Sequence, residues 1–218
     1  MDSTANPTVR KLAAAGIIGG LATSASAVVV QAIVQPASDV SDEMWSYPWP
    51  GDALAPVSTL YAGFHFLVFL GMLGFARSGH AGTSRSARIG VGLALVGTFI
   101  FFVAEFASIP FSDQRMDNSG PMVVGACFGL GVTLTAIGLL VAGVATLRAD
   151  AWRDWRRFAP LAAGLWATVM IGMSFTSALP TGVAIYGLTL VLLNLAVYTD
   201  PAPAASNNRS PKVRARVE

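Results

Sequence analysis

The sequence predicts an all-α protein, a polytopic membrane bundle of six transmembrane helices with both termini on the cytoplasmic side. Hydrophobic residues make up 54% of the 218 residues and charged residues 12%. The charged share is about half of what a soluble domain carries. The apolar residues form six runs, each long enough to cross roughly 30 Å of hydrocarbon as a helix. The basic residues gather in alternate connectors, as the positive-inside rule requires.

The six predicted spans cover about 12–34, 54–76, 89–110, 121–147, 158–179 and 182–198. The connectors between them are too short to fold as separate domains. We therefore expect a cytoplasmic N-terminal tail over 1–11 and a single transmembrane domain over 12–198. The segment 199–218 is rich in Pro, Ala, Asn and Arg without an apolar period, which predicts a disordered basic cytoplasmic tail.

The charge distribution sets the predicted orientation. Thirteen of the 14 basic residues fall on one side of the predicted bundle, and Arg115 alone falls on the other. The side that holds Arg115 carries six acidic residues: Asp39, Asp42, Glu43, Asp52, Asp113 and Asp117. Because cytoplasmic connectors carry the excess of Lys and Arg, this pattern predicts that both termini are cytoplasmic and that the protein lies in the plasma (inner) membrane.

The first span has two interpretations. Arg10 and Lys11, an apolar run and the small residues 25–27 resemble a secretory signal with its cleavage site. The apolar run continues through 28–34 to a full span, so we favour an uncleaved first helix. Cleavage would leave five spans and an outside N-terminus.

Glycines four residues apart occur in the first and fourth spans. Gly16 and Gly20 form one pair, and Gly125 and Gly129 form the other. Such small residues let helix backbones approach closely in lipid. Packing within the bundle is the favoured role, and a dimer interface is the alternative.

The first outer connector, residues 35–53, is acidic and aromatic. Its most distinctive residues are Asp42, Glu43, Trp45 and Trp49. Trp favours the lipid headgroup layer, and the nearby prolines prevent a regular helix. We favour an aromatic anchor on the outer leaflet, and a lid over the bundle is the alternative.

The connector 148–157 places two Trp residues among four Arg residues. It predicts an interfacial turn that contacts lipid phosphates, so the lipid bilayer is the expected partner. Because the basic residues lie in short connectors between apolar runs, we expect no nucleic acid to bind. A homo-oligomer or a membrane protein partner is compatible with this sequence.

Two ionisable residues lie well inside the predicted spans, His65 in the second and Glu105 in the third. An ionisable side chain is costly in hydrocarbon, so each is a candidate functional residue. Their distances from the predicted span ends differ by about 9 Å at 1.5 Å per residue. We therefore expect a staggered arrangement and no direct ion pair.

Polar residues of the second span lie on one helix face with His65. Ser58, Tyr61 and His65 are spaced i, i+3 and i+7, which places them on one side of a helix. With Glu105 at the level of Tyr61, they predict a polar ladder from the outer surface toward the membrane midplane. The alternative for His65 is a neutral ring that joins two helices, and for Glu105 a carboxylate that reaches outer water or stays protonated.

No nucleotide-binding, zinc-protease or serine-nucleophile motif occurs in the sequence. One Cys and a single His within the spans give no set of metal ligands, so we expect neither a metal nor a cofactor. No residue is a catalytic candidate on these grounds.

The layout over about 10–200 resembles small six-span bacterial membrane proteins, of the actinobacterial kind, that are grouped as domains of unknown function. The resemblance rests on SDVSDEMWSYPWP in the first outer connector, ARSG after the second span and IPFSD after the third. It implies the six-span layout, and it implies no activity and no functional residue.

Three functions follow as hypotheses from the sequence. The first is small-solute or proton-linked permeation along the polar ladder. The second is a structural or accessory subunit of a membrane assembly. The third is a membrane-embedded enzyme that acts on a lipid or isoprenoid with Glu105 as an acid, and we favour it least.

Overall fold

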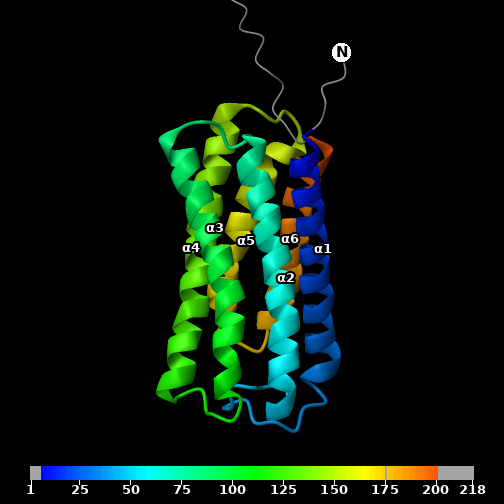
Figure 1. The fold of residues 1–218 in the computed structure, drawn as a ribbon, viewed down its shortest axis with the longest axis vertical. Coiled ribbons are helices and arrows are strands. Elements are labelled where there is room, and N and C mark those ends of the chain that lie inside the picture. Colours follow the sequence, from blue (N-terminus) through cyan, green and yellow to red (C-terminus); the bar gives the residue numbers. More distant parts are fainter. Residues whose placement is uncertain (1–5, 175, 201–218) are drawn as a thin grey trace, which may run out of the picture.

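The computed structural model describes residues 6–174 and 176–200, and every regular element within them is a helix. Six long helices run along a common axis (Figure 1). They are α1 (Pro7–Val29), α2 (Gly51–Ser78), α3 (Arg85–Ser108), α4 (Ser119–Ala149), α5 (Ala159–Met173) and α6 (Leu179–Thr199). A π-helical turn, Val30–Val34, extends α1, and 3₁₀ turns at Ile109–Phe111 and Trp155–Phe158 follow α3 and precede α5.

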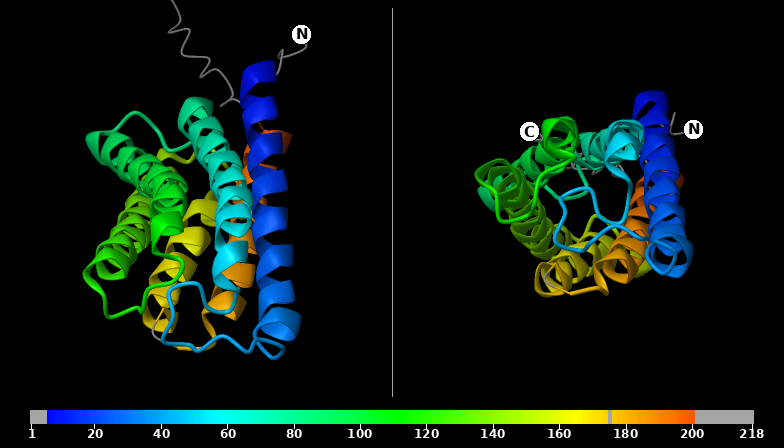
Figure 2. Two further views of the ribbon diagram at one scale, coloured as in Figure 1. Left: turned by 60° about the horizontal axis from the view of Figure 1, so that its bottom comes forward. Right: turned by 90° about the horizontal axis from the view of Figure 1, so that it is seen from below.

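The helices form a ring in chain order. Each helix contacts the next, and α6 closes the ring against α1 (Figure 2). Residues 6 and 200 and the connectors 79–84 and 150–158 lie at one end, which we call the terminal end. The segment 35–50, which we call the Trp loop, lies at the other end with the connector 112–118 and the residues 174 and 176–178. We call this the Trp-loop end.

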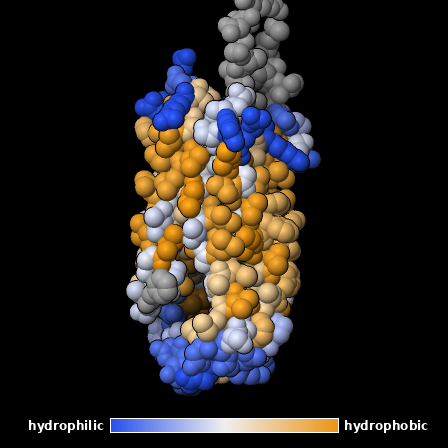
Figure 3. Space-filling view, turned by 90° about the vertical axis from the view of Figure 1, so that its left-hand side faces the viewer, coloured by the Kyte–Doolittle hydropathy of each residue, from blue (hydrophilic) through white to orange (hydrophobic). Residues whose placement is uncertain are grey.

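Five helical segments are long and apolar enough to cross a membrane. They are Pro7–Val34, Gly51–Ser78, Arg85–Phe111, Ser119–Ala149 and Leu179–Thr199. The surface in Figure 3 carries an apolar band between two polar ends. Because a bilayer is apolar between two polar headgroup layers, this arrangement indicates a multi-pass membrane protein.

Most helices extend beyond the apolar runs from which the spans were predicted. The start of α1 moves to Pro7 because the Asn6 side chain accepts hydrogen bonds from the Thr8 and Val9 amides. The start of α3 moves to Arg85 because the Ser84 hydroxyl accepts one from Ala87. Such caps satisfy the free amides of the first turn, so the helix begins at the cap and not at the first apolar residue.

The fifth predicted span, 158–179, is wrong at its far end, because α5 stops at Met173. The Ser174 hydroxyl donates a hydrogen bond to the Met170 carbonyl, and the Thr176 hydroxyl donates one to the Met173 carbonyl. Hydroxyl groups that compete for helix carbonyls favour turns. The connector to α6 is therefore longer than the predicted two residues, and α5 is the shortest of the six helices.

Close contacts between helices occur at glycines. A β-carbon at Gly20 of α1 would lie 2.8 Å from the Gly187 carbonyl oxygen of α6, and Gly16 is equally tight against Asn194. This confirms that the first glycine pair packs within the bundle. The second pair does not, since Gly125 has only Trp45 near it, at 3.8 Å, and Gly129 faces open space.

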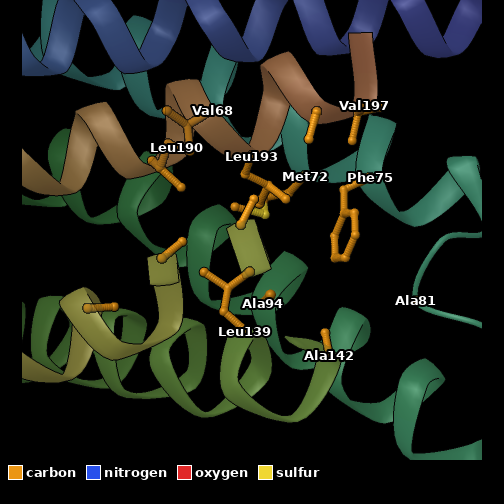
Figure 4. Close-up of a cluster of buried hydrophobic side chains, with 14 of the residues drawn as sticks. Val68, Met72, Phe75, Ala81, Ala94, Leu139, Ala142, Leu190, Leu193 and Val197 are labelled. Atoms are coloured by element: carbon orange, nitrogen blue, oxygen red, sulfur yellow. The ribbon is translucent and has the colours of Figure 1, made fainter. Parts of the chain in front are cut away.

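The apolar core runs along the ring from Val9 and Phe75 near the terminal end to Met170 in the last turn of α5. Figure 4 shows Val68, Met72 and Phe75 of α2 facing Leu139 of α4 and Leu193 of α6. All but Val68, at 4%, are no more than 1% exposed. Of the two candidate ionisable residues, Glu105 lies near the end of α3 toward the Trp loop, and His65 lies at the middle of α2.

Candidate functional site

His65 and Glu105 lie in direct contact, which corrects the expectation of a staggered arrangement without an ion pair. His65 Nδ1 and Glu105 Oε1 are 3.4 Å apart. The side chains are 24% and 9% exposed, respectively. Nδ1 has no partner that meets hydrogen-bond geometry, so the contact is an approach of two polar groups and not a linear hydrogen bond.

The register of α2 against α3 explains the contact. Ser58 lies opposite Ser108, and the ring of His65 stacks on Phe101 with centroids 5.2 Å apart. Glu105 is thus only about one helical turn, or about 6 Å, from the level of His65. Side chains on a helix lean toward its N-terminus. Because α2 and α3 are antiparallel, His65 and Glu105 lean toward each other and cross the remaining distance.

Ser58 belongs to the same polar site, on its Trp-loop side. The Ser58 and Ser108 hydroxyls are 3.1 Å apart, and the Ser108 hydroxyl donates to the Glu105 backbone carbonyl at 2.6 Å. Both serines are buried. These bonds join α2 to α3 beside the Glu105 side chain and hold the two helices in the register that the site needs.

Tyr61 and His65 face the interior of the ring. The α2 side that contacts α1 carries Gly71 and Gly74, and the side that contacts α3 carries Ser58. Helix geometry places Tyr61 and His65 between these two sides. Their partial exposure therefore opens inward, toward the centre of the bundle.

The polar site ends where the apolar core begins. Val68 and Met72 follow His65 on the same side of α2 and are 4% and 1% exposed. Two cavities have walls formed by known residues. Neither wall contains His65 or Glu105. One is an apolar groove on the α2 surface between Pro56 and Leu67, and the other lies at the terminal end. The polar ladder is thus closed on its terminal side.

The Trp loop crosses the mouth of the ring, as the view along the axis in Figure 2 shows. It pairs with the connector 112–118 through an antiparallel bridge between Met44 and Arg115. The Trp45 amide donates to the Gln114 carbonyl at 2.8 Å, and the Met116 amide donates to the Glu43 carbonyl at 2.8 Å. Two connectors that are far apart in the sequence therefore form one cover.

The four Trp-loop residues singled out in the sequence differ in their surroundings. Glu43 pairs with Arg115 at 2.7 Å, and this carboxylate raises the pKa of the Arg115 guanidinium. Trp45 is partly buried and reaches toward Gly125 of α4. Trp49 is also partly buried, and Asp42 is exposed. The ring of Trp45 is thus folded against the bundle, which is the arrangement that a lid needs.

Ser108 and His80 were missed by the sequence reasoning, and Trp152 was placed in an interfacial turn although that side chain is buried. Ser108 could have been found, since it lies three residues after Glu105 on the same helix face. His80 and Trp152 are 0% and 1% exposed at the terminal end, where their rings stack with centroids 4.3 Å apart. No sequence pattern predicts this second cluster, because both residues lie in connectors.

The described residues contain no group of three His, Cys, Asp or Glu side chains that could hold a metal ion. The chain matches no protein-family model, no curated protein and no solved structure. The resemblance to six-span proteins of the actinobacterial kind therefore stays a prediction. The function has to be inferred from the contact between His65 and Glu105 and its surroundings.

Proposed function

We propose that this chain is a six-span plasma-membrane protein that moves protons, or a small solute linked to protons, through the site formed by Ser58, Tyr61, His65 and Glu105. The observation that carries the proposal is the 3.4 Å approach of His65 to Glu105 inside the bundle. A lone carboxylate in hydrocarbon is costly unless it is protonated or paired. Two titratable groups in contact can hold one proton between them and release it when a cation takes its place.

The charges at the Trp-loop end support entry of a cation from that side. Five acidic residues, Asp39, Asp42, Glu43, Asp113 and Asp117, lie in the connectors there, with Arg115 as the one basic residue. Clustered carboxylates raise the local concentration of cations. Glu105 lies one turn before the end of α3 on this side, and His65 lies deeper, at the middle of α2. Val68 and Met72 are buried beyond His65, so the structure fits a closed form in which the core must open to complete a path.

We infer the orientation from the same distribution. The terminal end carries Arg10, Lys11 and the arginines of the connectors 79–84 and 150–158 with their flanking turns. The positive-inside rule places this end in the cytoplasm and the Trp-loop end outside. Entry from the Trp-loop end is then entry from the outer side of the plasma membrane.

The two other hypotheses have weaker support. Gly16 and Gly20 pack against α2 and α6 inside the bundle, so they are not available to a partner protein. An assembly subunit would have to bind its partner through another surface. A lipid-modifying enzyme would need a deep pocket beside Glu105. Neither of the two cavities described above contains Glu105 in its wall. Proton-linked transport expects a hydrated path beside the site, and its support is the contact between His65 and Glu105.

Reconstituted liposomes that contain a pH-sensitive dye test the proposal. We expect wild-type protein to dissipate an imposed pH gradient, with Na⁺, K⁺ or ammonium as the counter-ion, faster than empty liposomes do. Glu105→Gln keeps the side chain's shape but removes its titration, so the rate should fall to that of empty liposomes. His65→Gln should lower the rate as well.

Asp150→Asn is the matched control, because this exposed carboxylate lies at the terminal end, outside both the site and the acidic connectors, and Asn tolerates its positive φ of 49°. It should retain the wild-type rate. Equal rates for wild type and Glu105→Gln, at equal protein incorporation, would contradict the proposal.

A further inference from the structure

A second polar cluster lies at the terminal end, separated from His65 by the apolar core. His80 follows α2 and is fully buried, and its ring stacks on Trp152. Trp152 stacks in turn on Phe75, with centroids 6.2 Å apart. These contacts fix the connector 150–158 against the end of α2.

A cavity of about 1080 Å³ adjoins this cluster. Its walls come from the segment before α3 and its first turn, from the end of α4, and from the connector that contains Trp152. The charged side chains on its walls are Arg148, Asp150, Arg153, Asp154, Arg156 and Asp200. The cavity is therefore polar, and three arginines and three aspartates line it.

The formal charges of the three arginines and three aspartates in the cavity balance, but two of the arginines have no ion pair within the described part of the chain. Asp154 pairs closely with Arg156, and Asp200 lies 3.7 Å from His80. Arg148 and Arg153 have no ion pair with any described residue, and Asp150 is the remaining carboxylate. The N-terminus of α3, with the Ser84 and Ser86 hydroxyls 3.0 Å apart, adds further positive potential.

The buried side chains beside the cavity have unused hydrogen-bond donors. Trp152 lines the cavity, is 1% exposed, and has no acceptor for its Nε1 among the described residues. The ring nitrogens of His80, one a donor and one an acceptor in the neutral ring, also have no hydrogen-bond partner there. A buried donor without a partner is costly, so the Trp152 indole favours a ligand that offers an acceptor.

We propose that this cavity binds a phosphate group, carried either by the headgroup of an anionic phospholipid or by free phosphate. A guanidinium group presents paired donors that match phosphate oxygens, and a helix N-terminus stabilises the same anion. Arg148 and Arg153 hold the phosphate from α4 and its connector, the first turn of α3 faces it, and the Trp152 indole supplies a fixed donor. This site is independent of the His65–Glu105 contact.

Binding of two probes to the full chain in non-ionic detergent tests the proposal and separates the two sources. Native mass spectrometry measures retention of phosphatidylglycerol against phosphatidylcholine, and ³¹P NMR measures inorganic phosphate. The variant Arg148→Gln/Arg153→Gln should weaken binding of the relevant probe by about tenfold or more, because charge-assisted hydrogen bonds are lost. Trp152→Phe keeps the stacked ring but removes the donor, and it should weaken binding by a smaller factor.

The control is Arg85→Gln/Arg88→Gln, which removes two exposed arginines at the same end that do not line the cavity. It should change binding by less than about twofold, since these two side chains lie outside the cavity wall and make no contact with a bound phosphate. Selective retention of phosphatidylglycerol assigns a lipid headgroup, and binding of inorganic phosphate alone assigns a free phosphate. Equal losses in both double variants, or no binding of either probe to wild type, would overturn the proposal.

Discussion

Glu105 and His65 meet because their helices run in opposite directions. Each side chain leans toward the N-terminus of its own helix, so Glu105 leans toward the terminal end and His65 toward the Trp loop. The sequence predicted both residues and the face of Tyr61. It could not predict the contact, because depth counted from the ends of apolar runs ignores the relative register of α2 and α3, which the Ser58–Ser108 bond reports.

His80 provides a prediction at the residue scale for the dependence of stability on pH. Burial lowers the pKa of His80 below its ordinary 6.5, Asp200 raises it by less, and Arg156 lowers it further. The unfolded chain therefore binds this proton more readily than the folded chain does. Stability should be fully present above pH 6.5 and should fall as the pH drops below it.

Thermal melting in detergent between pH 8 and pH 5 checks this prediction. His80→Asn removes the titrating group, so its melting temperature should fall less than that of the wild type over the same pH range. A steeper fall in the variant than in the wild type would contradict the assignment.

The helices were predictable as elements, but their ends and contacts were not. Apolar runs indicate each helix, whereas the side chains of Asn6 and Ser84 set where α1 and α3 begin. Glycine spacing was only a partial guide. Gly16 and Gly20 lie in helix contacts and Gly129 does not, because four-residue spacing places glycines on one face without indicating which face is covered.

Glycines of α4 provide a prediction at the scale of the element. A β-carbon at Gly138 would lie 2.6 Å from the Gly90 carbonyl oxygen of α3, whereas one at Gly129 would meet nothing within 4 Å. Gly138→Leu should therefore force α3 and α4 apart and cost about 1–3 kcal/mol, as overpacking does. Gly129→Leu should change stability by less than about 0.5 kcal/mol.

Melting temperatures of the two variants in the same detergent measure this difference. The two substitutions add the same side chain to the same helix, so propensity and hydrophobicity are matched. Equal melting temperatures would show that the α3–α4 contact does not depend on Gly138.

The whole molecule combines an apolar core with one polar contact inside the ring. The core runs along most of the bundle, and His65, Glu105 and Tyr61 lie between its middle and the Trp-loop end. Composition predicted a membrane bundle with charged ends. Composition could not predict that residues 35–50 cross the ring. This cover depends on backbone pairing between Met44 and Arg115, and backbone hydrogen bonds do not depend on which side chains are present.

The cover gives a prediction at the scale of the whole molecule. Met44 and Arg115 are opposite each other in an antiparallel bridge and do not exchange hydrogen bonds with each other, a geometry with closely spaced Cα atoms. Met44→Cys/Arg115→Cys, with Cys127→Ala to remove the natural thiol, should form a disulfide under mild oxidation. If the cover must move during transport, oxidation should stop proton flux and reduction should restore it.

Mass spectrometry of the intact protein before and after reduction detects the cross-link. Asp39→Cys/Arg115→Cys in the same background is the control, and it should not cross-link. Failure of the first pair to oxidise would show that the two connectors are not held together.

The most direct test of the central claim, a polar site that opens toward the Trp-loop end and is closed by the core, is the reactivity of a cysteine at Tyr61. In the Cys127→Ala background, Tyr61→Cys should react with a membrane-impermeant thiol reagent added from the Trp-loop side and not from the terminal side. Met72→Cys, whose site is 1% exposed in the core, should react from neither side until the protein is denatured. Reaction of Tyr61→Cys from the terminal side, or its complete protection from both sides, would contradict the account.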